Sequence, residues 1–204
     1  MPKTVTDERR FTTQTVEFRA AAADDDTLGT IHGYAAVFNE DTVIDSWEGR
    51  FVERIAPGAF KKTIAERRDQ IKVLFNHGQD PSIGDKPLGK LDILREDQTG
   101  LYMSVRLVDT SYNRDLIALV RAGALHSQSF RFSVIRDNWD KAKNPYVRTL
   151  KEVKLYELGP VTFPAYEKTT ASARTRQLLP ESDRGLTPQA AIARLTLLKR
   201  KLYK

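Results

Sequence analysis

The sequence predicts a mainly β protein of the α+β class, in which about seven antiparallel strands form a barrel surrounded by a few helices. Short segments that alternate apolar and polar residues recur between residues 30 and 165. Only two stretches in that range have the spacing of a helix. The chain has 204 residues, of which 40% are apolar, and this is enough for the core of one domain.

Composition excludes several kinds of site. The chain has no cysteine, so it has no disulfide, no thiolate zinc site and no cysteine nucleophile. Its three histidines are scattered along the sequence, and we expect neither a metal nor a cofactor. No run of 18 apolar residues occurs, and the first residues carry no apolar signal region. We therefore expect no membrane helix and no secretory signal.

The net charge of +6 comes from one end of the chain. Residues 1–166 contain 24 basic and 24 acidic residues, whereas residues 167–204 contain nine basic and three acidic ones. The neutral part gives no electrostatic reason to bind nucleic acid, and only the basic tail could contact it weakly.

We expect three parts: a flexible N-terminal segment at 1–29, a main domain at 30–166, and a basic tail at 167–204. Residues 12–18 could form a strand within the first segment. In the tail, Thr187 followed by proline is typical of a helix start. A narrow apolar stripe then predicts a short C-terminal helix.

Within the main domain, strands are predicted first at 31–38 and 51–55. Pro57 suits the first position of a helix. A short apolar strand at 71–75 then delivers His77 at its end. The remaining expected elements are a hairpin of 88–94 and 101–107 around the loop 95–100, a helix from Thr110 or Ser111 to Arg121 stopped by Gly123, and strands at 128–134 and 147–158.

Three residue types that together perform nucleophilic catalysis occur at structured positions. His77 has the side chain best suited to activate a hydroxyl near neutral pH, and His32 and His126 are weaker candidates. Ser129 is a candidate nucleophile, but Ser127 would point to the same face of a strand. No Gly-x-Ser-x-Gly motif is present, which excludes an α/β-hydrolase elbow.

A carboxylate is needed to orient the histidine and to stabilise its charged form. Glu157 lies in an apolar strand, where a lone acid needs a partner. That partner could equally be a structural arginine or lysine. Asp80, Asp85 and Glu152 are other candidates, each in a loop or at a strand edge.

The order and the surroundings of these residues resemble the prohead (capsid maturation) proteases of tailed bacteriophages. The resemblance covers about residues 30–166, and its pieces occur in family order. They are Gly33–Asn39, Glu53–Phe60, Asn76-His77, Pro87–Lys90, Gly100–Tyr102, Val120–Leu125, Ser129-x-x-Phe132, Leu155–Glu157 and Val161–Ala165. The family is similar in fold to herpesvirus assemblins, which implies an assemblin-like barrel here.

The resemblance implies a role for each site residue. His77 matches the catalytic base, Ser129 the nucleophile, and Glu157 an acidic third member. The family commonly has glycine two residues after the serine, where this chain has Arg131. In the assemblin-like group an arginine near the nucleophile helps to stabilise the oxyanion, so Arg131 either serves that role or forms an ion pair. Phe130 is expected beside the substrate.

The resemblance also implies a serine endopeptidase that is packaged in the immature capsid within the host cytoplasm. It would cut the scaffolding segment from the major capsid protein and cleave itself in its tail. It would neither bind a membrane nor need a cofactor. Self-association would be compatible with this role. Two rival readings are a non-catalytic assembly factor with a degenerate protease fold and a nucleic-acid-binding barrel. The neutral main domain argues against the second.

Overall fold

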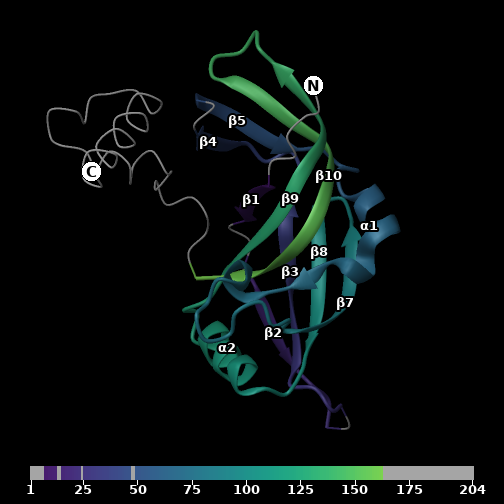
Figure 1. The fold of residues 1–204 in the computed structure, drawn as a ribbon, viewed down its shortest axis with the longest axis vertical. Coiled ribbons are helices and arrows are strands. Elements are labelled where there is room, and N and C mark those ends of the chain that lie inside the picture. Colours follow the sequence, from purple (N-terminus) through teal and green to yellow (C-terminus); the bar gives the residue numbers. More distant parts are fainter. Residues whose placement is uncertain (1–6, 13–14, 24, 47–48, 163–204) are drawn as a thin grey trace, which may run out of the picture.

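The computed structural model describes residues 7–12, 15–23, 25–46 and 49–162 (Figure 1). Within these residues, ten strands form two sheets. The first sheet has the order β1-β9-β10-β5-β4, and β6 pairs with β10 beside this path. Its strands are β1 (Asp7–Thr12), β4 (Thr42–Ser46), β5 (Gly49–Ile55), β6 (Lys72–Val73), β9 (Ser127–Asp140) and β10 (Tyr146–Val161).

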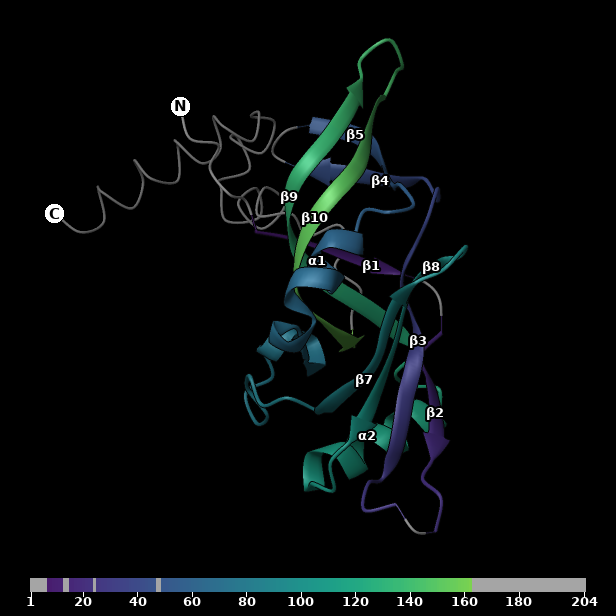
Figure 2. The same ribbon diagram turned by 90° about the vertical axis from the view of Figure 1, so that its right-hand side faces the viewer.

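The second sheet has the order β2-β3-β8-β7. Its strands are β2 (Glu17–Ala20), β3 (Gly29–Val37), β7 (Gly89–Glu96) and β8 (Gly100–Leu107). Figure 2 shows the long β9–β10 ribbon running from β4 and β5 toward this second sheet. The predicted hairpin of 88–94 and 101–107 is confirmed as β7 and β8, and Asp97 closes it by accepting hydrogen bonds from the N–H groups of Thr99 and Gly100.

The expectation of a closed or nearly closed barrel of about seven antiparallel strands is not met. Among the described residues, the first sheet ends at β1 and β4 and the second at β2 and β7, so both sheets are open. The pairing is also mixed, because β10 runs parallel to both β5 and β6. On one edge β9 pairs with β10 from Val147 to Val161, and on the other edge the shorter strands β5 and β6 pair with different parts of it. The mainly β class itself is confirmed.

Two α-helices accompany the sheets. The first, α1 (Lys61–Arg67), begins four residues after Pro57, which lies in the preceding turn. The second, α2 (Ser111–Arg121), agrees with the prediction, and the Thr110 hydroxyl accepts a hydrogen bond from the N–H of Asn113 as its N-cap. No helix in the described part of the chain is long and apolar enough to cross a membrane.

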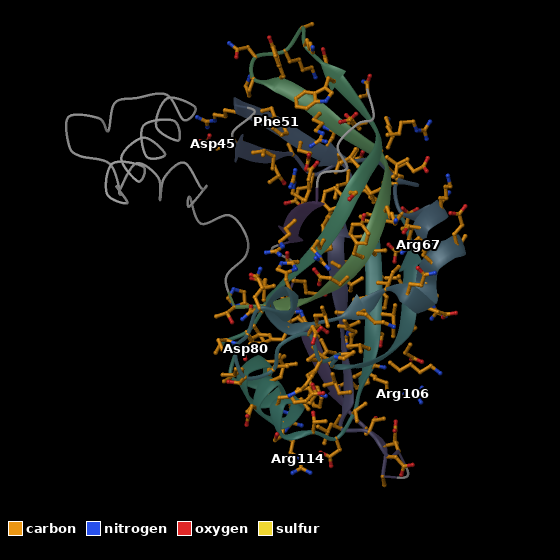
Figure 3. All side chains as sticks on the ribbon, viewed as in Figure 1. Asp45, Phe51, Arg67, Asp80, Arg106 and Arg114 are labelled. Atoms are coloured by element: carbon orange, nitrogen blue, oxygen red, sulfur yellow. The ribbon has the colours of Figure 1, made fainter. Side chains whose placement is uncertain are left out.

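One hydrophobic core lies between the two sheets and under the helices. Charged side chains such as Asp45, Arg106 and Arg114 project outward (Figure 3). The largest fully buried side chains come from both sheets, α2 and the segments next to them: Phe60, Phe130, Phe132, Ile31, Leu88, Leu101, Met103, Leu107, Leu116, Leu150, Leu155 and Leu158. This core fixes the relative positions of β9 and β10, which carry the candidate site.

The segment expected at 1–29 contains two strands. Residues 7–12 pair with β9 as β1, and residues 17–20 pair with β3 as β2. Both strands therefore belong to the same sheets as residues 29–161. The expected basic tail and its helix lie outside the described residues.

Candidate active site

His77 lies in a short turn, η2 (Phe75–Gly78), which follows β6 after one residue. The pairing of β6 with β10 places this segment against the end of β10, where the N–H of Leu74 donates to the carbonyl of Leu158 at 3.0 Å. The contact requires glycine at position 159, since a Cβ there would lie 2.1 Å from the Leu74 carbonyl oxygen.

The backbone of His77 has a left-handed conformation, with φ 59° and ψ 27°, and so has that of Asn76, with φ 47° and ψ 38°. Non-glycine residues adopt this region at a free-energy cost, and such positions concentrate at functional sites. The Asn76 side chain holds the segment in place by accepting from the N–H of Thr162 at 2.8 Å and donating to its hydroxyl at 3.2 Å.

The ring of His77 pairs with the carboxylate of Glu157. The distance from Nδ1 to Oε1 is 2.6 Å, and the side chains are 9% and 2% exposed. An ionised carboxylate only accepts hydrogen bonds, so Nδ1 carries the hydrogen in this pair. Nε2 is then left with its lone pair, which is the tautomer that a general base requires.

Arg131 lies opposite Glu157 in the β9–β10 register. Its Nε is 3.5 Å from the same Oε1 atom that contacts His77, and its guanidinium lies over the Tyr156 ring at 5.8 Å. The side chain is 34% exposed, so it reaches solvent while its Nε faces the buried carboxylate. The arginine therefore adds positive charge beside Glu157.

Ser129 lies opposite Gly159 in the same register, two residues from Arg131 on the same face of β9. Its side chain is fully buried, and its hydroxyl donates to the backbone carbonyl of Arg10 in β1 at 2.8 Å. Within the described segments, no hydrogen bond joins Ser129 to His77. Ser127 is also buried. It lies opposite Val161, which is two residues further from Glu157 along β10 than Gly159 is.

Phe130 has a different environment from the one expected. Its ring is 1% exposed and packs against the rings of Phe60 and Phe132, with centroids 5.6 and 5.1 Å away. The side chain belongs to the core and is not presented to a substrate in this conformation.

The other candidate residues lie in ordinary structural roles. Asp80 accepts from the N–H groups of Ser82 and Ile83, and Glu152 pairs with Lys62 at 3.2 Å. The centroid of the His32 ring lies 6.4 Å from that of Tyr102. In the described part of the chain, His77 is the histidine that has a carboxylate partner.

Sequence reasoning missed Asn76 as a positioning residue and Arg10 as the partner of the serine. The Asn-His-Gly sequence was an available signal for the first, since asparagine and glycine tolerate the left-handed region. Nothing local indicated the second, because 119 residues separate Arg10 from Ser129.

A mainly β protein in which a buried histidine–glutamate pair lies beside a strand serine has the components of a serine hydrolase site. The chain belongs to the caudovirus prohead serine protease family, whose sequence profile matches residues 14–182. It is 34% identical over 151 residues to the prohead protease of enterobacteria phage HK97. The match covers 73% of this chain and 61% of that protein, so the chain spans about three fifths of the relative's length.

Among solved structures, the chain is similar to the capsid assembly protease of bacteriophage T4. That match has a TM-score of 0.47 and 14% identity, and it covers 77% of this chain and 99% of the T4 chain.

Proposed function

We propose that this chain is a serine endopeptidase of phage capsid maturation, with Ser129 as nucleophile, His77 as general base and Glu157 as the group that orients His77. The observation that carries the proposal is the 2.6 Å contact between His77 Nδ1 and Glu157 Oε1, formed between residues 80 apart in the chain. The family membership of the chain supports the same reading.

The proposed reaction is acyl transfer followed by hydrolysis. The Ser129 oxygen attacks the carbonyl carbon of the scissile bond while His77 Nε2 takes its proton. The tetrahedral intermediate collapses when that proton passes to the leaving amine, and the amine departs with the C-terminal fragment. Water, deprotonated by His77, then releases the N-terminal fragment from Ser129.

Glu157 keeps the hydrogen on Nδ1 throughout and stabilises the imidazolium that forms. Arg131 is proposed to act by placing positive charge near the developing oxyanion. Backbone N–H groups next to it would donate to the oxyanion, and loss of one such donor costs about 3–4 kcal/mol. Phe130 is proposed to act only through packing, because its ring lies in the core.

The substrate is proposed to be the scaffolding segment of the major capsid protein, together with the enzyme's own basic tail at 167–204. Residues 30–166 would form most of the protease domain, of assemblin-like fold, and the enzyme would act inside the prohead in the host cytoplasm. The alternative of a non-catalytic assembly factor is favoured by one observation, namely that the Ser129 hydroxyl bonds to Arg10 and not to His77.

Co-expression with the major capsid protein tests the proposal, with Ser129→Ala as the inactive variant and Ser127→Ala as the matched control. Intact mass spectrometry should find shortened capsid protein with the wild type and with Ser127→Ala, and full-length capsid protein with Ser129→Ala. Circular dichroism should show that both variants are folded. Cleavage that persists with Ser129→Ala would assign the nucleophile elsewhere, and proheads without any cleavage would favour the assembly factor.

A further inference from the structure

Strand β1 covers the serine that the proposed function uses as nucleophile. It pairs antiparallel with β9 from Asp7 opposite Ser133 to Thr12 opposite Gln128, so it spans the edge of β9 on both sides of Ser129. Ser129 is 0% exposed, and its hydroxyl donates to a β1 carbonyl. A hydroxyl that is committed to this acceptor is not available to His77.

The same strand also contacts the segment that carries His77. The guanidinium of Arg9 donates to the amide oxygen of Gln79 at 2.9 and 3.0 Å, in the amide orientation that satisfies both groups. Gln79 lies two residues after His77. Strand β1 therefore bridges the two halves of the candidate site, β9 on one side and the η2 segment on the other.

Charged side chains hold β1 to the sheet. Arg10 pairs with the buried carboxylate of Glu53 on β5, and Glu8 pairs with Arg148 on β10 at 3.0 Å. Arg148 also contacts Glu53 at 3.1 Å, so the two pairs form one network. We call these four residues the ionic latch.

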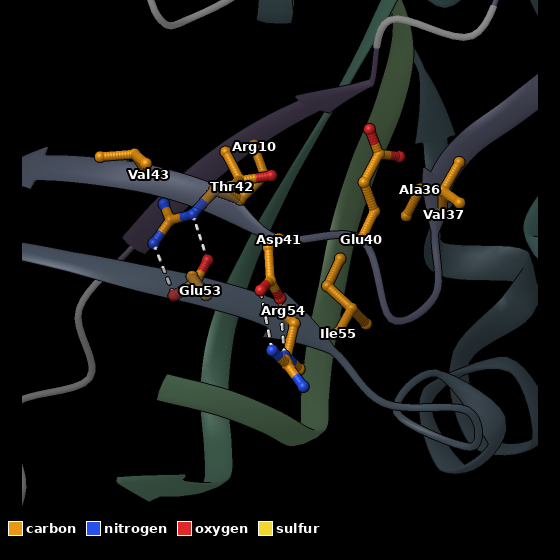
Figure 4. A pocket seen from close by; sticks show the side chains of 10 residues that line it. All are labelled: Arg10, Ala36, Val37, Glu40, Asp41, Thr42, Val43, Glu53, Arg54 and Ile55. Carbon is orange, nitrogen blue, oxygen red and sulfur yellow. Dashed lines mark hydrogen bonds and ion pairs between the residues drawn. The ribbon is translucent and has the colours of Figure 1, made fainter. Parts of the chain in front are cut away.

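The latch borders a cavity of about 280 Å³ between β1, β4 and β5, which Figure 4 shows with Arg10 bonded to Glu53. The three β1 side chains whose burial is described, Glu8, Arg9 and Arg10, are all charged and only partly buried. When the strand leaves, water can solvate these three charged side chains, which offsets part of the cost of breaking their ion pairs. Apolar side chains would instead be exposed to water at a cost in free energy. When β1 leaves, Arg148 and Glu53 still pair with each other at 3.1 Å, so neither buried charge loses all of its partners.

We propose that β1 is an autoinhibitory strand that occupies the substrate position on β9 and is displaced by an extended segment of the capsid protein. The inference rests on the proposed function of Ser129. A strand in the place of β1 would present a carbonyl where that of Arg10 now lies, next to the Ser129 hydroxyl. Addition of an extended peptide to an exposed strand edge is a general mode of recognition.

A disulfide between β1 and β9 tests the proposal in the full-length chain, which has no cysteine of its own. Asp7 and Ser133 face each other in the register, and facing residues on paired strands lie within the Cα separation that a disulfide spans. The variant is Asp7→Cys with Ser133→Cys, and each single substitution is a control. The probe is a fluorophosphonate, whose covalent attachment to Ser129 is located by mass spectrometry.

The oxidised double variant should label at Ser129 at least about ten times more slowly than its reduced form, and should cleave capsid protein more slowly by a similar factor. The single variants should not respond to the oxidant. Equal labelling in the oxidised and reduced forms would overturn the proposal.

Hydrogen exchange separates this proposal from the proposed function. Glu53→Gln weakens the latch, and the amides of residues 127–133 should then exchange several-fold faster than in the control Glu152→Gln, whose partner Lys62 lies outside the latch. Unchanged exchange would overturn the role of the latch. If no form labels at Ser129, the nucleophile assignment fails, and the exchange measurement alone decides whether β1 leaves the edge.

Discussion

The backbone of His77 is held in a conformation that histidine seldom adopts, with φ 59°. A position of this kind costs on the order of 1–3 kcal/mol and persists only where its surroundings impose it. Here the pairing of Leu74 with Leu158 imposes it from one side and the contact with Glu157 from the other. As a result, Nδ1 of the nearly buried His77 ring faces the carboxylate of Glu157.

Replacement of Glu157 by glutamine should disturb the tautomer and orientation of His77 without unfolding the protein. Glutamine has a similar shape but no charge, and its amide can donate to Nδ1, which selects the wrong tautomer of His77. We expect kcat to fall by about 10³–10⁴-fold, by analogy with the effect of such a change in other serine proteases. The measurement is cleavage of a capsid-derived peptide at several substrate concentrations.

The control for Glu157→Gln is Glu152→Gln, which lies on the same strand outside the site. It should retain kcat within about two-fold, and both variants should remain cooperatively folded. An activity of Glu157→Gln within three-fold of the wild type would remove Glu157 from the mechanism.

At the scale of elements, the η2 segment and the end of β10 act as one unit. Gly159 allows the close approach of Leu74, and the side chain of Asn76 closes the far end by two hydrogen bonds to Thr162. The position of His77 is thus determined by the strand that also carries Glu157. A loop without these contacts would not hold the two side chains at 2.6 Å.

Asn76→Ala should therefore reduce activity in addition to stability. The substitution removes both hydrogen bonds and places alanine at positive φ, which together cost about 1–3 kcal/mol. We expect kcat to fall at least about ten-fold with little change in KM, because His77 is displaced while the substrate edge is intact. Peptide cleavage and urea unfolding measure the two effects.

Asn39→Ala is the matched control, since Asn39 also has positive φ, at 57°, but lies in the turn between β3 and β4. It should lose the part of the stability that comes from alanine at positive φ and keep its kcat. Equal loss of kcat in the two variants would mean that stability alone accounts for the effect.

At the scale of the whole molecule, a network of buried and partly buried charges joins four strands. Arg148 on β10 contacts Glu8, Glu53 and Asp137, on β1, β5 and β9 respectively. Burial by itself would lower the pKa of Arg148, but its hydrogen bonds with Glu8 and Asp137 and the charges of Glu8 and Glu53 raise that pKa overall. The guanidinium stays charged and compensates the carboxylates around it.

Arg148→Met should destabilise the protein strongly, because it leaves these carboxylates without their cation. Removal of one partner of a buried ion pair costs about 3–5 kcal/mol. Urea unfolding measures the change, and Arg114→Met is the control because it breaks a bidentate pair with Asp109 at the surface. The control should show no measurable loss, and a similar loss in both would contradict the structural role of the network.

Much of the fold follows from local patterns. The alternation in 88–94 and 101–107 and the polar loop with Asp97 predicted a hairpin that the structure contains. Thr110 predicted the start of α2. In the N-terminal segment one strand was expected at 12–18, and the structure has β1 and β2 on either side of it. Their pairing with β9 and β3 depends on residues about 120 and 12 positions away, and their own sequence is largely charged.

The sequence by itself determined the mainly β class, the α2 boundary and the short set of residues able to perform nucleophilic catalysis. Only the tertiary structure decided which acid meets His77, choosing Glu157 over Asp80, Asp85 and Glu152. It also decided that the strands form two open sheets and that β1 covers Ser129. The physical reason is that these outcomes depend on pairing between strands far apart in the chain. No tight turn sets the register of such strands, so it is fixed only when their apolar faces pack together in the core.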